Sequence, residues 1–516
     1  MKNIIYKLFI VSTLTFGIVS CDEFVDYEAS ETYNIVADDY FKSSNDYEAA
    51  LVGVYDVTQW TLYNFMVGEI ASENSLCGGE SATDVIGLQK IDDMIHDAEN
   101  DQLTRIWQYM YEGINRANYM VENKDKMDFS RKSELYGEVH FLRAFFYFEL
   151  TKIFGDVPLF TNSRLTAGDS GTLSRSPQSE VYALIESDLQ AAISALPLSK
   201  STNGRATSLA AHALLGKVYL FQDKFDEAAG ILEPLIGLYT LPADPQSTFL
   251  KGGENGAESV YEIQHSKGSN WWDWGYVPQG TEGNFGVIHH GIRGYSGPLY
   301  SSGWSFNVPT QDLVDAYSAG DKRKDVSILD IEAWAASTGA KYTTGYEHTG
   351  YFNNKYIPRA GESQAQQELN YETNFRYIRY ADVLLMAAEA AVETGSLERG
   401  RTLVNLVRNR AKTMTPVAGT NPDIELYNDP WVDQAVARKA VRFERRLELA
   451  MEGHRYFDLV RWGNMTAHMN AYIANEAATI TTFGKGQSFQ DKHVRYPIPL
   501  SAIDLSGGVL VQNPGH

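Results

Sequence analysis

The residues best suited to ligand chemistry lie in a Gly-rich stretch, Ser269 to Tyr276 (SNWWDWGY). A sugar ring has an apolar face of C–H groups and a rim of hydroxyls, so binding it requires flat aromatic faces beside amide or carboxylate groups. If the stretch is extended, Trp272 and Trp274 share a face about 6.6 Å apart, comparable to the repeat of a sugar chain. The stretch therefore predicts a carbohydrate site, and the alternative is a set of core tryptophans that anchor a long loop. The candidates are Trp271, Trp272, Trp274 and Tyr276 for stacking, and Asn270 and Asp273 for hydroxyl contacts.

Other reactive side chains do not form a recognisable catalytic or metal motif. The adjacent His289 and His290 lack carboxylates or thiols at metal-ligand spacing, so we expect no metal there. The chain contains no Cys-x-x-Cys, no Gly-rich phosphate loop after a strand and no Gly-x-Ser-x-Gly. The pattern predicts no cofactor and no catalytic residues. Tyr295, Tyr300 and Trp304 are further aromatics, of which Tyr295 is a ligand candidate and Trp304 a structural one.

A group of charged residues near the C-terminus could suggest acid–base chemistry, but helical spacing favours another role. Glu444, Arg445, Arg446, Glu448 and Asp458 have the spacing of ion pairs between helices or of solvated helix faces. Asp382 lies within an apolar helical stretch and is expected to pair with an arginine, for which Arg143 is one candidate.

The N-terminus has the pattern of an export signal. Lys2 and Lys7 precede an apolar run from Leu8 to Val19, which is too short to span a membrane. The run ends in Ile18-Val19-Ser20-Cys21, which resembles the lipobox of bacterial lipoproteins and predicts acylation of Cys21. The alternative is an ordinary secreted protein. Asp22 and Glu23 resemble the surface-export signal of Bacteroidetes lipoproteins, and only Cys77 remains as a second cysteine, so no internal disulfide is expected.

Charge and length restrict the classes of function. The chain has 516 residues, with 66 acidic and 44 basic residues and a net charge of −22. Such a surface repels nucleic acid, so nucleic-acid binding is not expected. A neutral glycan fits it better than a sulfated one.

Apolar periodicity predicts a mainly α fold with repeated helical hairpins. Helices are expected over 101–123, 134–154 and 179–196. The second of them ends before Gly155, a residue type that commonly ends helices. Thr207 is predicted to cap a helix to about Phe221, followed after Asp223-Lys224 by a second helix. A looser copy runs from Tyr380 to Arg410 with a turn at Gly395-Ser396. Small residues in both copies match tetratricopeptide-type spacing, which predicts an interrupted helical-repeat scaffold; the alternative is two ordinary helical hairpins.

The segment between the two copies differs in character. Residues 241–373 are rich in Gly, Ser, Asn, Tyr and Trp, with a short strand expected over Glu258–Gln264 and a short helix capped by Thr310. Asp429 is predicted to cap the last major helix, with Pro430 in its first turn and the pattern running through Ala450. Pro497 and Pro499 lie near a possible edge strand. We divide the chain into a signal peptide (1–20), an acidic tether (21–38) and one domain (39–516), comprising parts 39–240, 241–373, 374–463 and 464–516.

The motifs together resemble the SusD/RagB-like family of Bacteroidetes outer-membrane nutrient-binding lipoproteins. Their number, order and spacing carry the resemblance over nearly the whole chain. The pieces are FKSSNDYEAALVGVY (41–55), WQYMYEGINRAN (107–118), GEVHFLRAFFYFELTKIFGDVP (137–158), residues 204–219, GWSFNVPTQD (303–312), RYADVLLMAAEA (379–390), ERRLELAMEGHRYFDLVRWG (444–463) and YPIP (496–499).

The resemblance implies a helical scaffold of tetratricopeptide-like repeats and no enzyme activity. It implies that the protein binds an oligosaccharide or polysaccharide outside the cell, anchored to the outer membrane by lipid. Its expected partner is a SusC-like TonB-dependent barrel transporter, which imports the glycan. The stretch Glu69–Glu80 resembles an acidic, Gly-rich family loop near the glycan site, so Glu73 and Asn74, with Glu69, become candidates for hydroxyl contacts. The alternative is that they cap the helix or order the loop.

Two other functions remain open from the sequence. An enzyme acting on the same glycan would place two carboxylates across an aromatic cleft. A helical scaffold for protein assembly would bury the tryptophans and bind no sugar.

Overall fold

Helices form most of the fold in the computed structural model, which describes residues 40–161, 163–166, 168–172, 174–199, 202–267, 282–364, 367–414, 424–479 and 488–516. The N-terminal part contains α2 (Ser44–Asp56), the 3-10 helix η3 (Val57–Trp60), α3 (Leu62–Ile70), α4 (Ile86–Asp92), α5 (Asp101–Glu122), α6 (Lys132–Phe154), α7 (Gln178–Ala195), α8 (Ser208–Leu220) and α9 (Phe225–Leu232). The C-terminal part contains α15 (Tyr380–Glu393), α16 (Leu397–Thr413), α17 (Gln434–Glu448), α18 (Arg455–Arg461), α19 (Met465–Thr479) and α20 (Leu500–Leu505).

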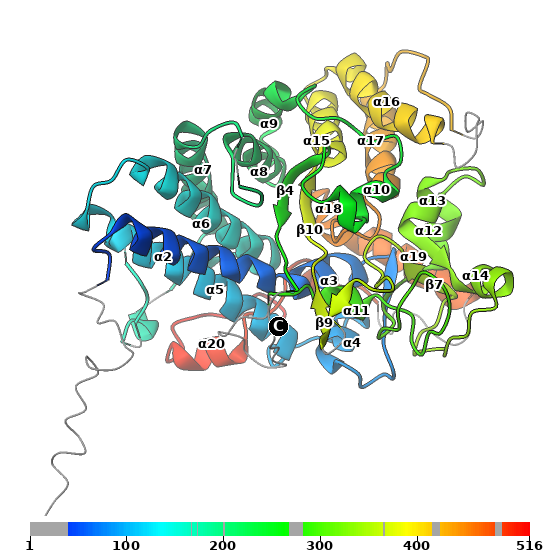
Figure 1. Cartoon of the computed structure of the whole chain (residues 1–516), viewed down its shortest axis with the longest axis horizontal. Helices are drawn as coiled ribbons and strands as arrows, with labels where there is room; N and C mark the ends of the chain where they lie inside the picture. The colour runs from blue at the N-terminus through cyan, green and yellow to red at the C-terminus, as the bar shows by residue number, and fades with distance from the viewer. Residues whose placement is uncertain are drawn as a thin grey trace, which may run out of the picture.

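The long helices pack in sequence order into one curved array. Each of α5 to α9 contacts the next, and α9 then contacts α15, which packs against α16 and α17 (Figure 1). The second group of helices therefore continues the first, although residues 233–379 separate α9 from α15 in the chain. This arrangement confirms the mainly α class and the interrupted helical-repeat scaffold expected from the sequence.

Small residues at two helix crossings allow the close approach that the repeat pattern predicted. A Cβ atom on Gly216 of α8 would lie 2.4 Å from Leu232 of α9, and one on Gly400 of α16 would lie 2.5 Å from Val392 of α15. Such distances are shorter than van der Waals contact, so only glycine allows these helix pairs to pack at this separation.

The segment between the two groups of helices contains short elements. Its helices are α10 (Gln246–Phe249), α11 (Gly286–His289), α12 (Gln311–Ala316), α13 (Arg323–Ser327) and α14 (Ile331–Thr338). The strands of the structure pair in antiparallel twos: β4 (Ser259–Ile263) with β10 (Phe375–Arg379), β1 (Ser75–Gly78) with β5 (Phe306–Pro309), β6 (Ile328–Asp330) with β7 (Tyr351–Asn353), β8 (Ser363–Gln364) with β9 (Gln367–Tyr371), and β2 (Val157–Pro158) with β3 (Arg175–Ser176). The predicted strand in this segment is confirmed as β4.

The N-caps show which helix starts could be predicted from local sequence signals. Thr207 caps α8 by accepting a hydrogen bond from the Ala210 N–H, and Thr310 caps α12 through the Leu313 N–H, as predicted. Asp433, and not Asp429, caps α17, so the prediction that Asp429 and Pro430 begin this helix is wrong.

The reason is a tertiary contact that holds the preceding chain away from a helical path. Arg408 of α16 donates from Nε to the Glu425 carbonyl at 2.8 Å, and Asn405 exchanges two hydrogen bonds with the Tyr427 backbone, each 3.0 Å long. Helix formation can begin only after this segment has crossed α16. At the C-terminus, Pro497 and Pro499 precede α20 and the expected edge strand is not formed there.

The helices found in the described residues are all too short or too polar to cross a bilayer. The expected signal peptide, the acidic tether and Cys21 lie outside the described residues.

Candidate functional site

The Trp-rich stretch lies between two well-fixed ends. Residues 268–281 are outside the described residues, and with them Asn270, Trp271, Trp272, Asp273, Trp274 and Tyr276. The chain enters this stretch from β4 and leaves it towards α11. At the two ends, the Ser266 N–H donates to the Glu282 carbonyl at 2.8 Å. The residues before and after the stretch therefore lie side by side. We call residues 264–266 and 282–284 the neck, and the sequence between them the Trp-rich loop.

The neck is fastened to the chain before β10 on both sides. On the entry side, the His265 N–H donates to Asn374 Oδ1 at 2.9 Å. On the exit side, the Asn284 N–H donates to the Tyr371 carbonyl at 2.7 Å, and Asn284 Nδ2 donates to the Thr373 carbonyl at 2.8 Å. Sequence analysis did not single out Asn284 or Asn374, because an asparagine in a loop-rich segment carries no signal of its long-range partner.

Residues from α3 and the chain before it support the neck from the other side. Gln59 Nε2 donates to the Gln264 carbonyl at 2.9 Å, and the rings of Tyr63 and Phe285 meet edge to face at 6.4 Å between centroids. The N-terminal helices, the end of β4 and α11 thus meet at the base of the Trp-rich loop. The neck is therefore held by two segments that are far from it in the sequence, residues 59–63 and residues 371–374.

A small cavity lies beneath the neck. Its volume is about 20 Å³, enough for a water molecule and far too small for a sugar ring. His265 and His290 line it, and burial lowers the pKa of each to about 3, so both imidazoles are neutral near pH 7. The cavity lies among the residues that support the neck. A glycan is too large to enter it and must bind elsewhere.

Glu73 and Asn74 lie in the interior, which corrects the expectation that they face a ligand. Glu73 Oε1 accepts hydrogen bonds from Arg455 Nε at 2.9 Å and from His468 Nε2 at 2.8 Å. Burial alone would raise the pKa of Glu73, but Arg455, Arg446 and His468 outweigh it and hold the pKa well below its ordinary value. The glutamate is therefore an ionised partner of basic residues from the C-terminal part.

Asn74 and Glu69 complete the same connection. Asn74 Nδ2 donates to Glu69 Oε1 at 3.0 Å, and Asn74 Oδ1 accepts from Arg446 Nε at 2.9 Å. Glu69 also accepts from the backbone N–H groups of Met451 and Gly453. The acidic loop after α3 thus connects the N-terminal helices to α17 and to the turn that follows it. These contacts favour the alternative that the residues order the loop.

Tyr295 is also a buried residue, only 8% exposed. Its hydroxyl donates to the Pro298 carbonyl at 2.6 Å and accepts from Trp334 Nε1 at 2.9 Å, within a separate hydrophobic cluster that includes Ile292 and Tyr300. The structure does not bring Tyr295, Glu73 or Asn74 to the neck of the Trp-rich loop. We assign all three to the framework.

The charged residues near the C-terminus form buried ion pairs, as predicted. Arg445 connects Asp382 of α15, at 2.9 Å, with Asp458 of α18, at 3.1 Å. Lys217 of α8 also contacts Asp382, at 3.1 Å. The expected arginine partner of Asp382 is therefore Arg445, and Arg143 is the wrong candidate because it pairs with Asp188 at 2.7 Å.

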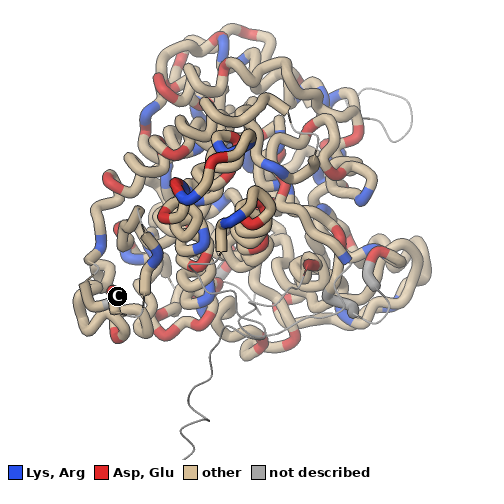
Figure 2. The backbone as a smooth tube through the Cα atoms, turned by 60° about the vertical axis from the view of Figure 1, so that its left-hand side comes forward, with Lys and Arg blue, Asp and Glu red and all other residues tan. Residues whose placement is uncertain are grey.

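A second buried network surrounds Glu448 and Glu444. Glu448 contacts Arg379 at 2.7 Å and also pairs with Arg410, while Glu444 contacts Arg323 of α13 and Arg408 of α16. Acidic and basic positions are interleaved along the backbone of the described residues (Figure 2). These carboxylates neutralise arginines and hold helices together, so we assign none of them a catalytic role.

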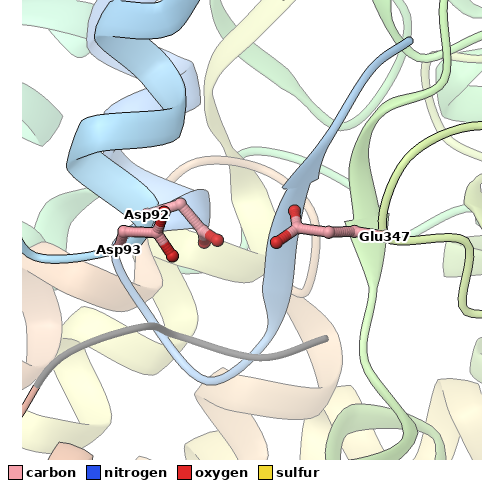
Figure 3. A group of neighbouring side chains, drawn as sticks. All are labelled: Asp92, Asp93 and Glu347. Carbon is pink, nitrogen blue, oxygen red and sulfur yellow. The ribbon is translucent and has the colours of Figure 1, made fainter. Parts of the chain in front are cut away.

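Three carboxylates form the one group in the described part of the chain whose oxygens lie close enough to share a cation. Asp92 and Asp93 come from the end of α4, and Glu347 approaches from the opposite side with ligand atoms within 4.8 Å (Figure 3). Glu347 Oε2 also accepts from the Gly78 N–H at 2.9 Å. Proximity of carboxylates alone does not establish a metal site, and the group is far from the neck in the sequence. His289 and His290 belong to no such group among the described residues.

The chain is similar to known proteins along its whole length. A family model described as SusD family matches residues 329–516, and one described as starch-binding, associating with outer membrane, matches residues 27–220. A SusD-like protein of Formosa agariphila is 28% identical, with 99% of each chain covered.

Two solved structures share the fold. A laminarin binding SusD-like protein is 32% identical, with a TM-score of 0.78 and coverage of 92% of this chain and all of the other. A surface glycan-binding protein A from Bacteroides fluxus is 26% identical, with the same TM-score and coverage. On the strength of the two family models and the 32% identical relative, the chain belongs to the SusD family.

Proposed function

We propose that this protein captures a glycan on its Trp-rich loop and delivers it to a TonB-dependent outer-membrane transporter without cleaving it. The observation that carries the proposal is the neck: a loop with three tryptophans and a tyrosine leaves and returns at one point fixed by backbone and asparagine hydrogen bonds. Fixed ends reduce the conformational entropy that a loop loses when it binds, which favours affinity.

The proposed ligand is a neutral glucan of the laminarin type. The 32% identical relative is described as laminarin binding, and the net charge of −22 disfavours sulfated or other polyanionic polymers. Within the loop, the indole rings of Trp271, Trp272 and Trp274 would stack on sugar faces, and Asn270 and Asp273 would contact hydroxyls.

Location and partner complete the proposal. Cys21 would carry the acyl chains that hold the protein on the outer membrane, facing the exterior. One matching family model is described as associating with outer membrane, which supports this location. The transporter would receive the glycan that the loop has concentrated at the surface.

Affinity electrophoresis of the lipid-free chain (residues 22–516) against laminarin, other neutral polysaccharides and a sulfated polymer tests the binding, and chromatography of each polymer after incubation tests for cleavage. We expect retardation by at least one neutral polymer, with its length unchanged. Shortened polymer would show an enzyme, and no retardation by any polymer would favour a protein scaffold.

A further inference from the structure

A polar groove lies between the first turns of α5 and the C-terminal helix α20, at one edge of the molecule (Figure 1). Its volume is about 530 Å³, which is in the range of pockets that hold small ligands. One wall presents Asp101, Arg105 and Gln108, whose spacing along α5 places them on one face of the helix. Ser501 and Asp504 of α20 form the other wall. We call this cavity the α5–α20 groove.

Hydrogen bonds outside the groove hold its two walls in place. The Leu500 N–H donates to the Ala98 carbonyl at 2.8 Å and so joins the start of α20 to the chain before α5. Asn513 Nδ2 donates to the Phe154 carbonyl at 2.9 Å and to the Tyr496 carbonyl at 2.6 Å, which fixes the chain on both sides of α20. A ligand therefore meets a preformed surface, which lowers the entropic cost of binding.

The groove adjoins the support of the neck. Gln59 and Trp60 are consecutive residues of η3, and they connect the two sites. Gln59 Nε2 donates to the Gln264 carbonyl in the neck at 2.9 Å. The ring of Trp60 meets the ring of Tyr109 edge to face at 5.3 Å between centroids, and Tyr109 lines the groove.

Tyr63 provides a second connection between the neck and the groove. Its ring meets that of Phe285, next to the exit side of the neck, at 6.4 Å between centroids. Burial raises the pKa of Tyr63 to about 12, and the nearby charge of Arg105 opposes this shift. One tyrosine side chain thus lies between the neck and a residue that lines the groove. A glycan chain that extends from the Trp-rich loop on this side would reach the groove next.

The side chains of the groove have the chemistry that a neutral glycan requires. Glu99, Asp101 and Asp504 are exposed, and none lies within ion-pair distance of a basic group among the described residues. Their carboxylates can accept hydrogen bonds from sugar hydroxyls, whereas Arg105 and Gln108 can donate to hydroxyl and ring oxygens.

The charge balance of the groove excludes other ligands. Three carboxylates face one guanidinium there, so a sulfated or uronic acid chain would be repelled. An apolar peptide would bury the carboxylates without hydrogen-bond partners, which is unfavourable.

We propose that the α5–α20 groove is a second glycan subsite, which holds the continuation of a neutral polysaccharide whose first sugars stack on the Trp-rich loop. This inference rests on the proposed function, because it assumes that the loop binds a glycan. It adds a preference for polymers over short oligosaccharides. A single glycan chain that occupies two neighbouring subsites gains the second contact without a second loss of translational freedom.

Calorimetric titration of the lipid-free protein with laminaritriose and with laminarin tests the groove. The variant Gln108→Ala/Asp504→Ala removes one exposed polar side chain from each wall. We expect the ratio of laminarin affinity to laminaritriose affinity to fall about tenfold or more in this variant. The control, Gln190→Ala/Asp226→Ala, changes the same residue types at exposed positions of α7 and α9 and should leave the ratio unchanged.

The possible failures of this titration are distinguishable. An unchanged ratio in the groove variant, with the wild-type protein binding laminarin, would overturn the second subsite and leave the proposed function intact. The same result would follow if the affinities for both ligands fell by equal factors. No binding of either ligand by the wild-type protein would instead contradict the proposed function, and the second subsite with it.

Hydrogen–deuterium exchange of the wild-type protein provides a measurement that needs no substitution. We expect saturating laminarin to slow the exchange of backbone amides in residues 98–108 and 500–505, which carry the two walls. Laminaritriose, which is too short to reach from the loop into the groove, should leave both segments unchanged. Unchanged exchange of both segments with bound laminarin would overturn the proposal.

Discussion

Ser266 and Glu282 face each other across the neck of the Trp-rich loop, with the Ser266 N–H 2.8 Å from the Glu282 carbonyl oxygen. Fifteen residues lie between them in the sequence, yet the loop begins and ends at one point. The described residues at the two ends of the loop therefore form one hydrogen-bonded base, and changes at this base should affect ligand binding without altering any residue that contacts the ligand.

Asn284→Ala tests this role of the neck. The change removes the hydrogen bond from Asn284 Nδ2 to the Thr373 carbonyl and the one that Asn284 Oδ1 accepts from the Gly286 N–H. We expect glycan affinity to fall by up to about thirtyfold, since the two lost hydrogen bonds contribute about 1 kcal/mol each, about 2 kcal/mol together. Calorimetric titration measures the affinity, and the exposed Asn428→Ala serves as control. Equal affinities of the two variants would show that the neck does not organise the loop.

Gly68→Ala tests the contact between α3 and the turn after α17. A Cβ atom on Gly68 would lie 2.1 Å from the Gly453 carbonyl oxygen, a backbone atom that cannot rotate away. We expect the free energy of unfolding to fall by about 1–3 kcal/mol or more because of overpacking. Gly53→Ala in α2 is the matched control, since nothing lies within 4 Å of its Cβ position, and it should leave stability equal or slightly higher. Urea denaturation of both variants measures the two free energies of unfolding.

Arg445→Met tests the buried ion pairs. The variant leaves Asp382 and Asp458 buried without this arginine, and breaking a buried pair in this way lowers stability by about 3–5 kcal/mol. Arg399→Met removes only the surface contact with Glu233, and surface pairs contribute at most about 1 kcal/mol. A small effect of Arg445→Met in thermal unfolding would contradict the structural role of the network.

The lowered pKa of Asp458 predicts how the free energy of unfolding depends on pH. Burial would raise its pKa, but Arg445 and Arg461 outweigh this and lower the pKa to about 2 from an ordinary value near 3.8. A carboxyl group with a lower pKa in the folded state stabilises the fold above its unfolded pKa, and this contribution is lost as the pH falls from about 4 to about 2. Asp458→Asn should make unfolding less sensitive to pH in that range. An unchanged slope in acid titration would refute this assignment.

The sequence predicted much of the scaffold because helix formation leaves local signals. Apolar periodicity located α5, α6 and α8, and the caps of α8 and α12 were predicted correctly as Thr207 and Thr310. The predicted cap of α17 was wrong because Arg408 and Asn405 of α16 bind the backbone of the preceding chain, which is not helical, and no local signal records that contact.

Pairings between distant residues limited the prediction of the site. A carboxylate in a polar loop resembles a solvent-exposed group in the sequence, but Glu73 meets Arg455 nearly 400 residues later. The same limit applies to Asp382, for which the sequence suggested Arg143 as a partner although the fold brings Arg445 to it.

The most direct test of the central claim is calorimetric titration of laminarin into the lipid-free protein and into Trp271→Ala, Trp272→Ala and Trp274→Ala. Trp431→Ala is the control, since Trp431 is a half-buried tryptophan that packs near α16. We expect binding by the wild-type protein and a loss of at least tenfold, about 1.4 kcal/mol, in at least one of the three loop variants but not in the control. Wild-type affinity in all three loop variants would contradict a glycan site on the Trp-rich loop.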